Sequence, residues 1–339
     1  MILVTGGTGL VGSHLLLHLL ASGASVRAIH RKNSDLQKVK EVFSYYREDS
    51  LALFSKIQWV EADLNNIPAL ELAFKGVTMV YHSAALISFD PHDFDSLHKI
   101  NKVGTENIVN LCIDKKIKKL CYVSSIAAIG KSTTGNPVTE EKEWNDTNAN
   151  VYAYSKHFAE IEVWRGAQEG VPVVIVNPGI ILGPGYWENG SGLLFKTSAK
   201  GMRYYFPGGT GFISVGDVIK IMVQLMNSPI ENERFIAVAE NLSYRSILEK
   251  ISQGFNKPAP KIGLKFWQLE IFRRMDWAIC LITNKKRKLT KNGLEALRNP
   301  QNYDNSKVNG TFKMEYESIQ SCVNHSCKKY LETHSTTLS

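Results

Sequence analysis

The chain opens with a short apolar segment, residues 2–5, that runs directly into three evenly spaced glycines, Gly6, Gly9 and Gly12. This pattern predicts a strand, a tight turn and a helix, because Gly6 permits the turn and Gly12 lets the helix pack on the strand. Gly9 lets the backbone approach a pyrophosphate, to which the helix N-terminus offers free N–H groups. We therefore predict a dinucleotide-binding turn made by Gly6, Thr8, Gly9, Leu10, Val11 and Gly12. A purely structural strand–turn–helix is the alternative.

Apolar strands alternate with helical patterns along the first half of the chain. This alternation predicts an α/β fold with a Rossmann doubly wound parallel sheet and right-handed crossovers. The expected helices include 13–22, 97–115 and one that carries Tyr152 and Lys156. The expected strands are 2–5, 24–30, 57–61, 77–82, 119–124 and 173–176.

The pattern changes after Pro178, where glycine-rich loops and less regular, aromatic helices follow. We predict a turn at 180–182 and a smaller C-terminal substrate-binding cap over the carboxyl edge of the sheet. The expected dinucleotide-binding domain covers residues 1–179 and a return segment at 212–239. The cap then comprises 180–211 and 240–339.

Composition and charge bear on the expected cofactor, metal binding and cellular location of the protein. The 339 residues carry a net charge of +8, which suits a phosphorylated cofactor, and no nucleic-acid-binding motif accompanies it. The five cysteines have no metal-ligand spacing, so we expect no metal site and a reducing, cytoplasmic location. No signal peptide and no apolar run long enough to cross a bilayer stands in the sequence.

The end of the second expected strand bears on the choice of dinucleotide. An acid there would bind the adenine-ribose hydroxyl of NAD. The chain instead has Arg31 and Lys32, and no acid before Asp35. Two cations suit the 2′-phosphate, so NADP(H) is the preferred cofactor, NAD(H) remains possible, and a solvated basic loop is the structural alternative.

Tyr152 and Lys156 stand four residues apart and so share one helix face. A nearby lysine cation and a nicotinamide ring would lower the tyrosine pKa from its usual ~10 and make it an effective proton donor or acceptor. Lys156 could also hold the nicotinamide ribose. The alternative is an ordinary exposed Tyr–Lys pair.

A serine pair, Ser124 and Ser125, ends the fifth expected strand. Ligands bind at the carboxyl edge of a parallel sheet, where a hydroxyl can hold a carbonyl oxygen that gains negative charge. Ser125 is the preferred candidate, with Ser124 as the alternative and simple capping of the strand as the structural interpretation.

Together these residues make the chain resemble an extended short-chain dehydrogenase/reductase, down to about residue 240. The matching motifs are the glycine turn, Asp63-Leu64, His82-Ser83-Ala84-Ala85, Asn101-x-x-Gly104-Thr105, Ser124-Ser125, Tyr152-x-x-x-Lys156, Pro178-x-x-x-x-Gly183-Pro184 and Val215-Gly216-Asp217-Val218. Gly216 departs from the family, which usually has an acidic or polar residue there.

The resemblance implies a role for each matching position. Asp63 and Leu64 would hold the adenine, and Ser83, Ala84 and Ala85 would line the pyrophosphate and nicotinamide ribose. Pro178 would pack near the nicotinamide carboxamide. The implied catalytic residues are Ser125, Tyr152 and Lys156, with Asn101 as a structural or proton-relay residue.

Within that family the chain looks closest to the dihydroflavonol reductase and 3β-hydroxysteroid dehydrogenase branch. Arg31 matches the NADP-binding arginine of that branch, and the segment at 180–182 is aliphatic. The expected partner is a small, apolar carbonyl compound, with five aromatic residues as pocket candidates: Phe89, Trp187, Phe195, Tyr204 and Phe206. A nucleotide-sugar epimerase or dehydratase with tightly bound NAD is the alternative, and a non-catalytic NADP-binding sensor or scaffold is a further one. A homodimer is left as an option.

The segment 266–288 combines Trp267, Phe272 and Trp277 with a basic run at 285–288. We predict a packed amphipathic cap helix followed by a solvated basic turn. A helix on a membrane surface or over a greasy substrate is the alternative.

Overall fold

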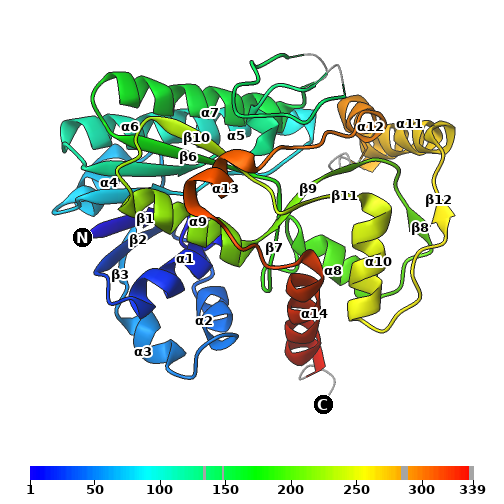
Figure 1. The fold of residues 1–339 in the computed structure, drawn as a ribbon, viewed down its shortest axis with the longest axis horizontal. Coiled ribbons are helices and arrows are strands. Elements are labelled where there is room, and N and C mark those ends of the chain that lie inside the picture. Colours follow the sequence, from blue (N-terminus) through cyan, green and yellow to red (C-terminus); the bar gives the residue numbers. More distant parts are fainter. Residues whose placement is uncertain (133–134, 147–148, 284–288, 336–339) are drawn as a thin grey trace.

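A parallel seven-stranded sheet forms the centre of the molecule, and the computed structural model describes residues 1–132, 135–146, 149–283 and 289–335 (Figure 1). The strand order is β10-β6-β5-β4-β1-β2-β3, so the chain winds outwards from β1 in both directions. The doubly wound α/β fold predicted from the sequence is confirmed. The strands are β1 (Ile2–Thr5), β2 (Val26–His30), β3 (Gln58–Glu61), β4 (Met79–His82), β5 (Lys119–Val123), β6 (Val173–Pro178) and β10 (Glu233–Ala237).

Two helical layers cover the sheet, and each has its own apolar core. One layer contains α1 (Leu10–Ala21), α2 (Gln37–Ser44), α3 (Ser50–Ser55), α9 (Val215–Asn227) and α13 (Ser306–Phe312). The other contains α4 (Ile67–Phe74), α6 (Gly104–Asp114) and α7 (Val151–Gln168). The helix expected at 97–115 is divided: α5 (Phe94–Leu97) precedes a π-helical stretch (His98–Val103), and α6 follows. The helices α2 and α3 were not predicted.

The cap contains a second, three-stranded sheet in the order β11-β9-β7 (Figure 1). Its strands are β7 (Ile180–Leu182), β9 (Gly209–Ser214) and β11 (Glu240–Ser243). The turn expected at 180–182 is therefore wrong: these residues pair with β9 in an extended conformation. The segment 212–239 is also divided, because β9 joins the cap sheet whereas α9 and β10 return to the main sheet.

The remaining elements complete the cap. Its core is formed by α8 (Gly192–Ala199), α10 (Tyr244–Gly254) and α14 (Ile319–Ser335), which pack around Trp187, Phe195 and Tyr330. A two-stranded ribbon of β8 (Tyr204–Tyr205) and β12 (Ile262–Gly263) leads into α11 (Phe266–Thr283) and α12 (Lys291–Arg298). No helix among the described residues is long and apolar enough to span a membrane.

The turn between β1 and α1 has almost no space at Gly12. A Cβ atom there would lie 2.1 Å from the Gly6 carbonyl oxygen, which is backbone and cannot move aside. At Gly9 a Cβ would meet only that oxygen, at 3.4 Å, and the Gly9 φ of −111° suits any residue.

The two glycines therefore predict different effects on stability. We expect Gly12→Ala to lower the free energy of unfolding by at least ~2 kcal/mol, because the added methyl group overpacks the turn. The matched variant Gly9→Ala should stay within ~0.5 kcal/mol of the wild type. Urea unfolding of both variants measures the difference, and equal stabilities would contradict this account of the turn.

Candidate active site

The glycine turn and the loop after β4 lie against each other at the carboxyl edge of the sheet. Gly6 adopts a φ of +70°, and a Cβ on it would lie 2.6 Å from the Ala84 amide nitrogen. The Ser83 hydroxyl donates a hydrogen bond to the Thr5 carbonyl oxygen at 2.7 Å. Helix α1 then begins at Leu10, with first-turn N–H groups that have no partner within the helix. The structure thus brings together two segments that the sequence implicated in holding a dinucleotide, and the open space beside Gly9 fits the approach of a phosphate.

An open pocket of about 440 Å³ lies at the carboxyl ends of β2 and β3. Arg31, Lys32 and Asp63, which the sequence made cofactor-binding candidates, line it. Glu61 also lines it, because the parallel register places Glu61 opposite His30, the last residue of β2. Sequence reasoning missed this acid, since it comes from the neighbouring strand. The other lining residues are Asn33, Ala62 and Asn66.

Leu64, which the family resemblance linked to the adenine, is held by the start of α6. A Cβ on Gly104 would lie 2.9 Å from the Leu64 side chain, and Asn107 donates a hydrogen bond to the Leu64 carbonyl oxygen at 2.9 Å. Leu64 is buried, whereas Asp63 beside it is exposed. The pair therefore presents a carboxylate towards the pocket and an apolar side chain towards the protein.

The two serines at the end of β5 have different environments. Ser124 is buried, and its hydroxyl donates a hydrogen bond to Glu160 at 2.6 Å. Ser125 is partly exposed, accepts a hydrogen bond from the Ala127 amide at 3.1 Å, and interacts with Tyr152. Ser125 is thus the serine whose hydroxyl lies beside the tyrosine.

Desolvation raises the pKa of Tyr152 to about 12, and a hydrogen bond with Ser125 opposes part of that rise. This direction differs from the lowering expected from Lys156. The burial of the Tyr152 hydroxyl is the main cause, and Lys156 is itself buried, donating hydrogen bonds to Tyr122 Oη at 2.6 Å and to the Val123 carbonyl oxygen at 2.9 Å. Burial also lowers the pKa of Lys156 to about 7, against a smaller opposing effect of Glu160.

Tyr122 connects Lys156 to a buried polar chain that the sequence did not reveal. The Tyr122 ring stacks on His82, with ring centroids 5.4 Å apart. His82 shares hydrogen bonds with Thr5 at 2.6 Å and with Thr105 at 2.9 Å. Burial lowers the pKa of His82 to about 3, so its imidazole is neutral at physiological pH. Lys156 is thus held to the sheet through a set of neutral polar groups.

Asn101 lies in the π-helical stretch and is buried. Its side chain accepts a hydrogen bond from the Leu86 amide at 2.7 Å and donates to the Leu86 carbonyl oxygen and to Ser155, both at 2.9 Å. Asn101 therefore ties the loop after β4 to helix α7, one residue from Lys156.

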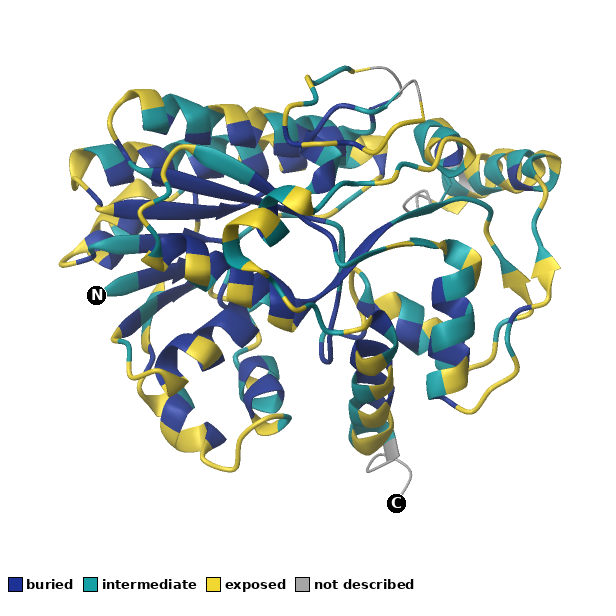
Figure 2. Cartoon of the chain, viewed as in Figure 1, coloured by how far each residue is buried: buried dark blue, intermediate teal, exposed yellow. Residues whose placement is uncertain are grey.

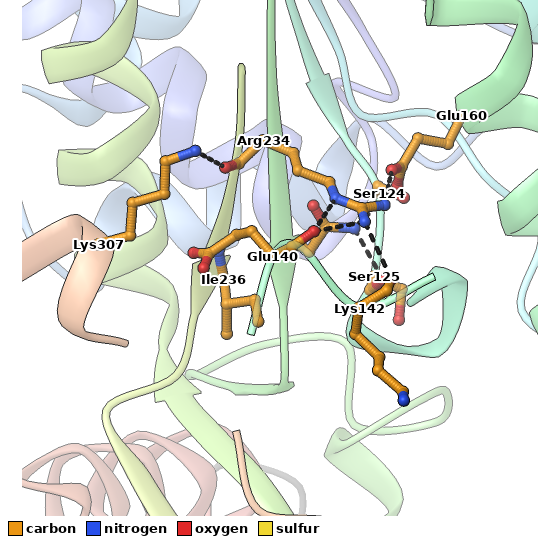
Figure 3. A network of polar contacts seen from close by, with 9 residues as sticks. Ser124, Ser125, Glu140, Lys142, Glu160, Arg234, Ile236 and Lys307 are labelled. Atoms are coloured by element: carbon orange, nitrogen blue, oxygen red, sulfur yellow. Dashed lines mark hydrogen bonds and ion pairs between the residues drawn. The ribbon is translucent and has the colours of Figure 1, made fainter. Parts of the chain in front are cut away.

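A buried ion pair anchors the middle of α7 (Figure 3). Glu160 pairs with Arg234 of β10 at 3.0 Å and accepts hydrogen bonds from Ser124 and from Asn177 of β6. Arg234 also donates to the Glu140 carbonyl oxygen at 2.8 Å. This network was missed because its members are far apart in the sequence, and it occupies the guanidinium of Arg234.

The candidate pocket aromatics separate into two groups. Trp187 and Phe195 are buried in the cap core and contact each other edge to face. Phe89, Tyr204 and Phe206 are exposed. Phe89 lies over the Tyr152 ring, with centroids 5.5 Å apart and the rings nearly perpendicular, so the tyrosine has an apolar neighbour. Pro178 ends β6 and is buried beside Ala237 of β10.

Residues 2–238 match the profile of the NAD dependent epimerase/dehydratase family. The chain belongs to this family. Its members include the extended short-chain dehydrogenases/reductases that the sequence motifs resembled, and the protein is accordingly an NAD(P)-dependent enzyme, an oxidoreductase of that family.

Curated relatives come from both branches of the family. The chain is 30% identical to a "Putative dihydroflavonol 4-reductase" of Synechocystis sp. over 90% of its length and 87% of the relative's. It is 29% identical to "Sterol demethylase protein B" of Methylococcus capsulatus, covering 77% and 76% of the two chains. It is 26% identical to "UDP-glucose 4-epimerase" of Vibrio cholerae, covering 81% of both.

Among solved structures, the crystal structure of gox2253 superposes with a TM-score of 0.82 at 23% identity, covering 98% of both chains. At this identity the likeness shows the shared fold.

The buried Lys156 predicts a specific pH dependence of stability. Its pKa is about 7 in the folded protein and 10.5 in an unfolded chain, so between these values only the unfolded chain binds the proton. Stability therefore rises with pH through this window by up to about 1.4 kcal/mol per pH unit and is constant below it.

A Lys156→Met variant lacks this titration. We expect the wild type to gain stability relative to the variant as the pH rises from 7 towards 10.5, in urea unfolding of the ligand-free proteins. A stability difference that does not change with pH would mean that Lys156 stays charged in the fold.

Proposed function

We propose that this enzyme reduces the carbonyl group of a small, largely apolar substrate, or oxidises the corresponding alcohol, with NADP(H) as cofactor. The observation that carries the proposal is the position of Tyr152, whose hydroxyl interacts with Ser125 while its ring lies against the exposed Phe89. A proton donor, an oxyanion ligand and an apolar wall thus occur together at the carboxyl edge of the sheet.

In this proposal Ser125, Tyr152 and Lys156 each have a separate role in the reaction. The nicotinamide cofactor, when bound, supplies or accepts the hydride. Ser125 would hold the carbonyl oxygen by a hydrogen bond as negative charge develops on it. Tyr152, which is protonated at neutral pH in the ligand-free protein, would donate the proton to that oxygen.

Lys156 would act mainly through its charge and its donor hydrogens. Its ammonium already finds one side-chain and one backbone acceptor, Tyr122 and Val123, which hold it near the end of β5. From there it would bind the nicotinamide ribose. Asn101 would keep α7 and the loop after β4 in register around these groups.

The state of the arginines favours the apolar substrate over a sugar nucleotide. A nucleoside diphosphate needs cations, yet Arg234 is committed to Glu160 and to a backbone carbonyl. Arg203 is exposed, and its backbone pairs with Ile262 in the β8–β12 ribbon. The relatives named as a dihydroflavonol reductase and a sterol demethylase protein support the apolar class. The epimerase relative keeps a nucleotide-sugar epimerase or dehydratase with tightly bound NAD as the alternative.

For the cofactor, the pocket between β2 and β3 contains charges of both signs. Arg31 and Lys32 are exposed at its edge and would bind a 2′-phosphate. Glu61 and Asp63 line the same pocket and would suit the 2′-hydroxyl of NAD. We favour NADP(H), because the cations directly follow β2, whose end faces the adenine ribose in this fold.

Arg31→Ala tests the cofactor assignment. We expect it to weaken NADPH binding by at least ~10-fold and to change NADH binding much less, since only NADPH carries the 2′-phosphate. Lys118→Ala is the control, because this exposed lysine precedes β5 at the opposite edge of the sheet. Isothermal titration with both cofactors gives the comparison, and equal losses for NADPH and NADH would refute the assignment.

Tyr152→Phe tests the reaction. It removes the hydroxyl and keeps the ring, so turnover of hydrophobic ketones should fall by at least ~100-fold while NADPH affinity is retained. The control is Tyr154→Phe, because Tyr154 stacks on Phe158 on another side of α7. The assay is NADPH consumption with a panel of aromatic and alicyclic ketones.

Thermal-shift measurements with NADPH and the same panel, extended to UDP- and dTDP-sugars, distinguish the substrate classes. Strong stabilisation by the sugar nucleotides alone would replace the reductase assignment with the epimerase alternative. A protein that binds NADPH but turns over no member of either class would favour the sensor or scaffold.

A further inference from the structure

Helix α11 turns an apolar face towards solvent. Trp267, Ile271, Met275 and Ile279 follow one another at intervals of four residues and therefore form one stripe along the helix. Phe272 lies beside this stripe. All five side chains are between 45% and 61% exposed. We call these five residues the α11 stripe.

The other side of α11 is the side attached to the protein. Leu269 is fully buried there, and Arg273 pairs with Glu270 at 2.5 Å. An ordinary surface helix buries most of its apolar side chains, whereas α11, among its described side chains, buries only Leu269 and exposes the stripe. The packed amphipathic helix predicted from the sequence is therefore wrong: the cap core is already filled by α8, α10 and α14. The basic turn predicted at 285–288 lies outside the described residues.

The elements around α11 are also exposed. The ribbon leading into it shows Tyr204 and Ile262, which are register partners of β8 and β12, to solvent. Figure 2 shows this end of the cap as exposed along the ribbon and much of the helix, away from the buried centre of the main sheet. The apolar surface is thus an extended feature rather than a single side chain.

The positive charge of the protein is concentrated in the same segment. Residues 257–291 contain ten lysines and arginines and two acids, so the remainder of the chain, with 30 of each, is neutral. Lys265 and Arg274 are exposed at the start and in the middle of α11, and the exposed Lys261 directly precedes β12. Neither acid lies on the stripe, and Asp276 accepts a hydrogen bond from the Leu289 amide at 3.1 Å.

We propose that the α11 stripe binds the surface of an anionic lipid bilayer. An exposed apolar helix face surrounded by cations is the pattern of helices that lie in the membrane interface, where tryptophan is also favoured. The helix does not qualify as a membrane span. A second copy of the chain is disfavoured as the occupant, because a two-fold interface would set the basic segment against itself.

The bilayer would then lie close to the start of the helix that carries Tyr152. Helix α12 packs next to α11 (Figure 1), with the Arg298 guanidinium over the Phe266 ring at 5.2 Å. Asn292 of α12 donates a hydrogen bond at 2.7 Å to the carbonyl oxygen of Ala149, two residues before α7. An apolar compound dissolved in the bilayer would thus be near the candidate active site.

Vesicle sedimentation of the full chain tests the proposal without any turnover, so its outcome is independent of the proposed reaction. The probes are vesicles of pure phosphatidylcholine and of an equal mixture of phosphatidylcholine and phosphatidylglycerol. We expect binding to the mixed vesicles that weakens as salt is added, and much weaker binding to the neutral ones. The double variant Ile271→Gln/Met275→Gln should lose at least ~10-fold in partitioning to the mixed vesicles.

The control is Leu72→Gln, which changes an equally exposed apolar residue on α4 and should leave vesicle binding unchanged. Equal melting temperatures of the two variants show that both are folded. Retention on neither kind of vesicle, or equal retention of the double variant and the control, would overturn the proposal. Dimerisation in analytical ultracentrifugation that the double variant abolishes, without vesicle binding, would assign the stripe to a second copy instead.

Discussion

The buried carboxylate of Glu160 is the interaction on which the arrangement of the candidate site depends. It joins α7 to three strands at once, through Ser124 just after β5, Asn177 of β6 and Arg234 of β10. A carboxylate removed from water is tolerated only when its hydrogen-bonding capacity is used, so each partner restricts where α7 can lie. The orientation of the tyrosine-bearing end of this helix relative to the strand ends follows from that restriction.

Different hydrogen-bond partners also give different roles to residues that look alike in the sequence. Ser124 and Ser125 are adjacent, but one hydroxyl serves the buried carboxylate and the other lies beside Tyr152. Desolvation lowers the pKa of Lys156 to about 7, and its amino group donates hydrogen bonds to Tyr122 and to a backbone carbonyl. The charge of Lys156 near neutral pH is therefore sensitive to any acceptor that enters the site.

Apolar residues of the chain occur both in the cap core and on exposed surfaces. Trp187 and Phe195 close its core, whereas Phe89 remains exposed over Tyr152. Because α8, α10 and α14 fill the cap core, the apolar stripe of α11 has no partner surface among the described residues and faces solvent. An apolar substrate and a lipid surface are recognised by the same physical effect, the removal of apolar area from water, so the two proposals are chemically consistent although they are tested separately.

The sequence by itself determined the parts that rest on local pattern. Glycine spacing and alternating apolar runs predicted the sheet, the turn around Gly6 and the strand boundaries to within two residues at most ends, because these depend on neighbours along the chain. Only the tertiary structure revealed Glu61 in the pocket at the ends of β2 and β3, the Glu160 network, the strand at 180–182 and the outward face of α11. The first three are contacts between distant segments, and the last depends on which helices fill the cap core, so no local pattern encodes them.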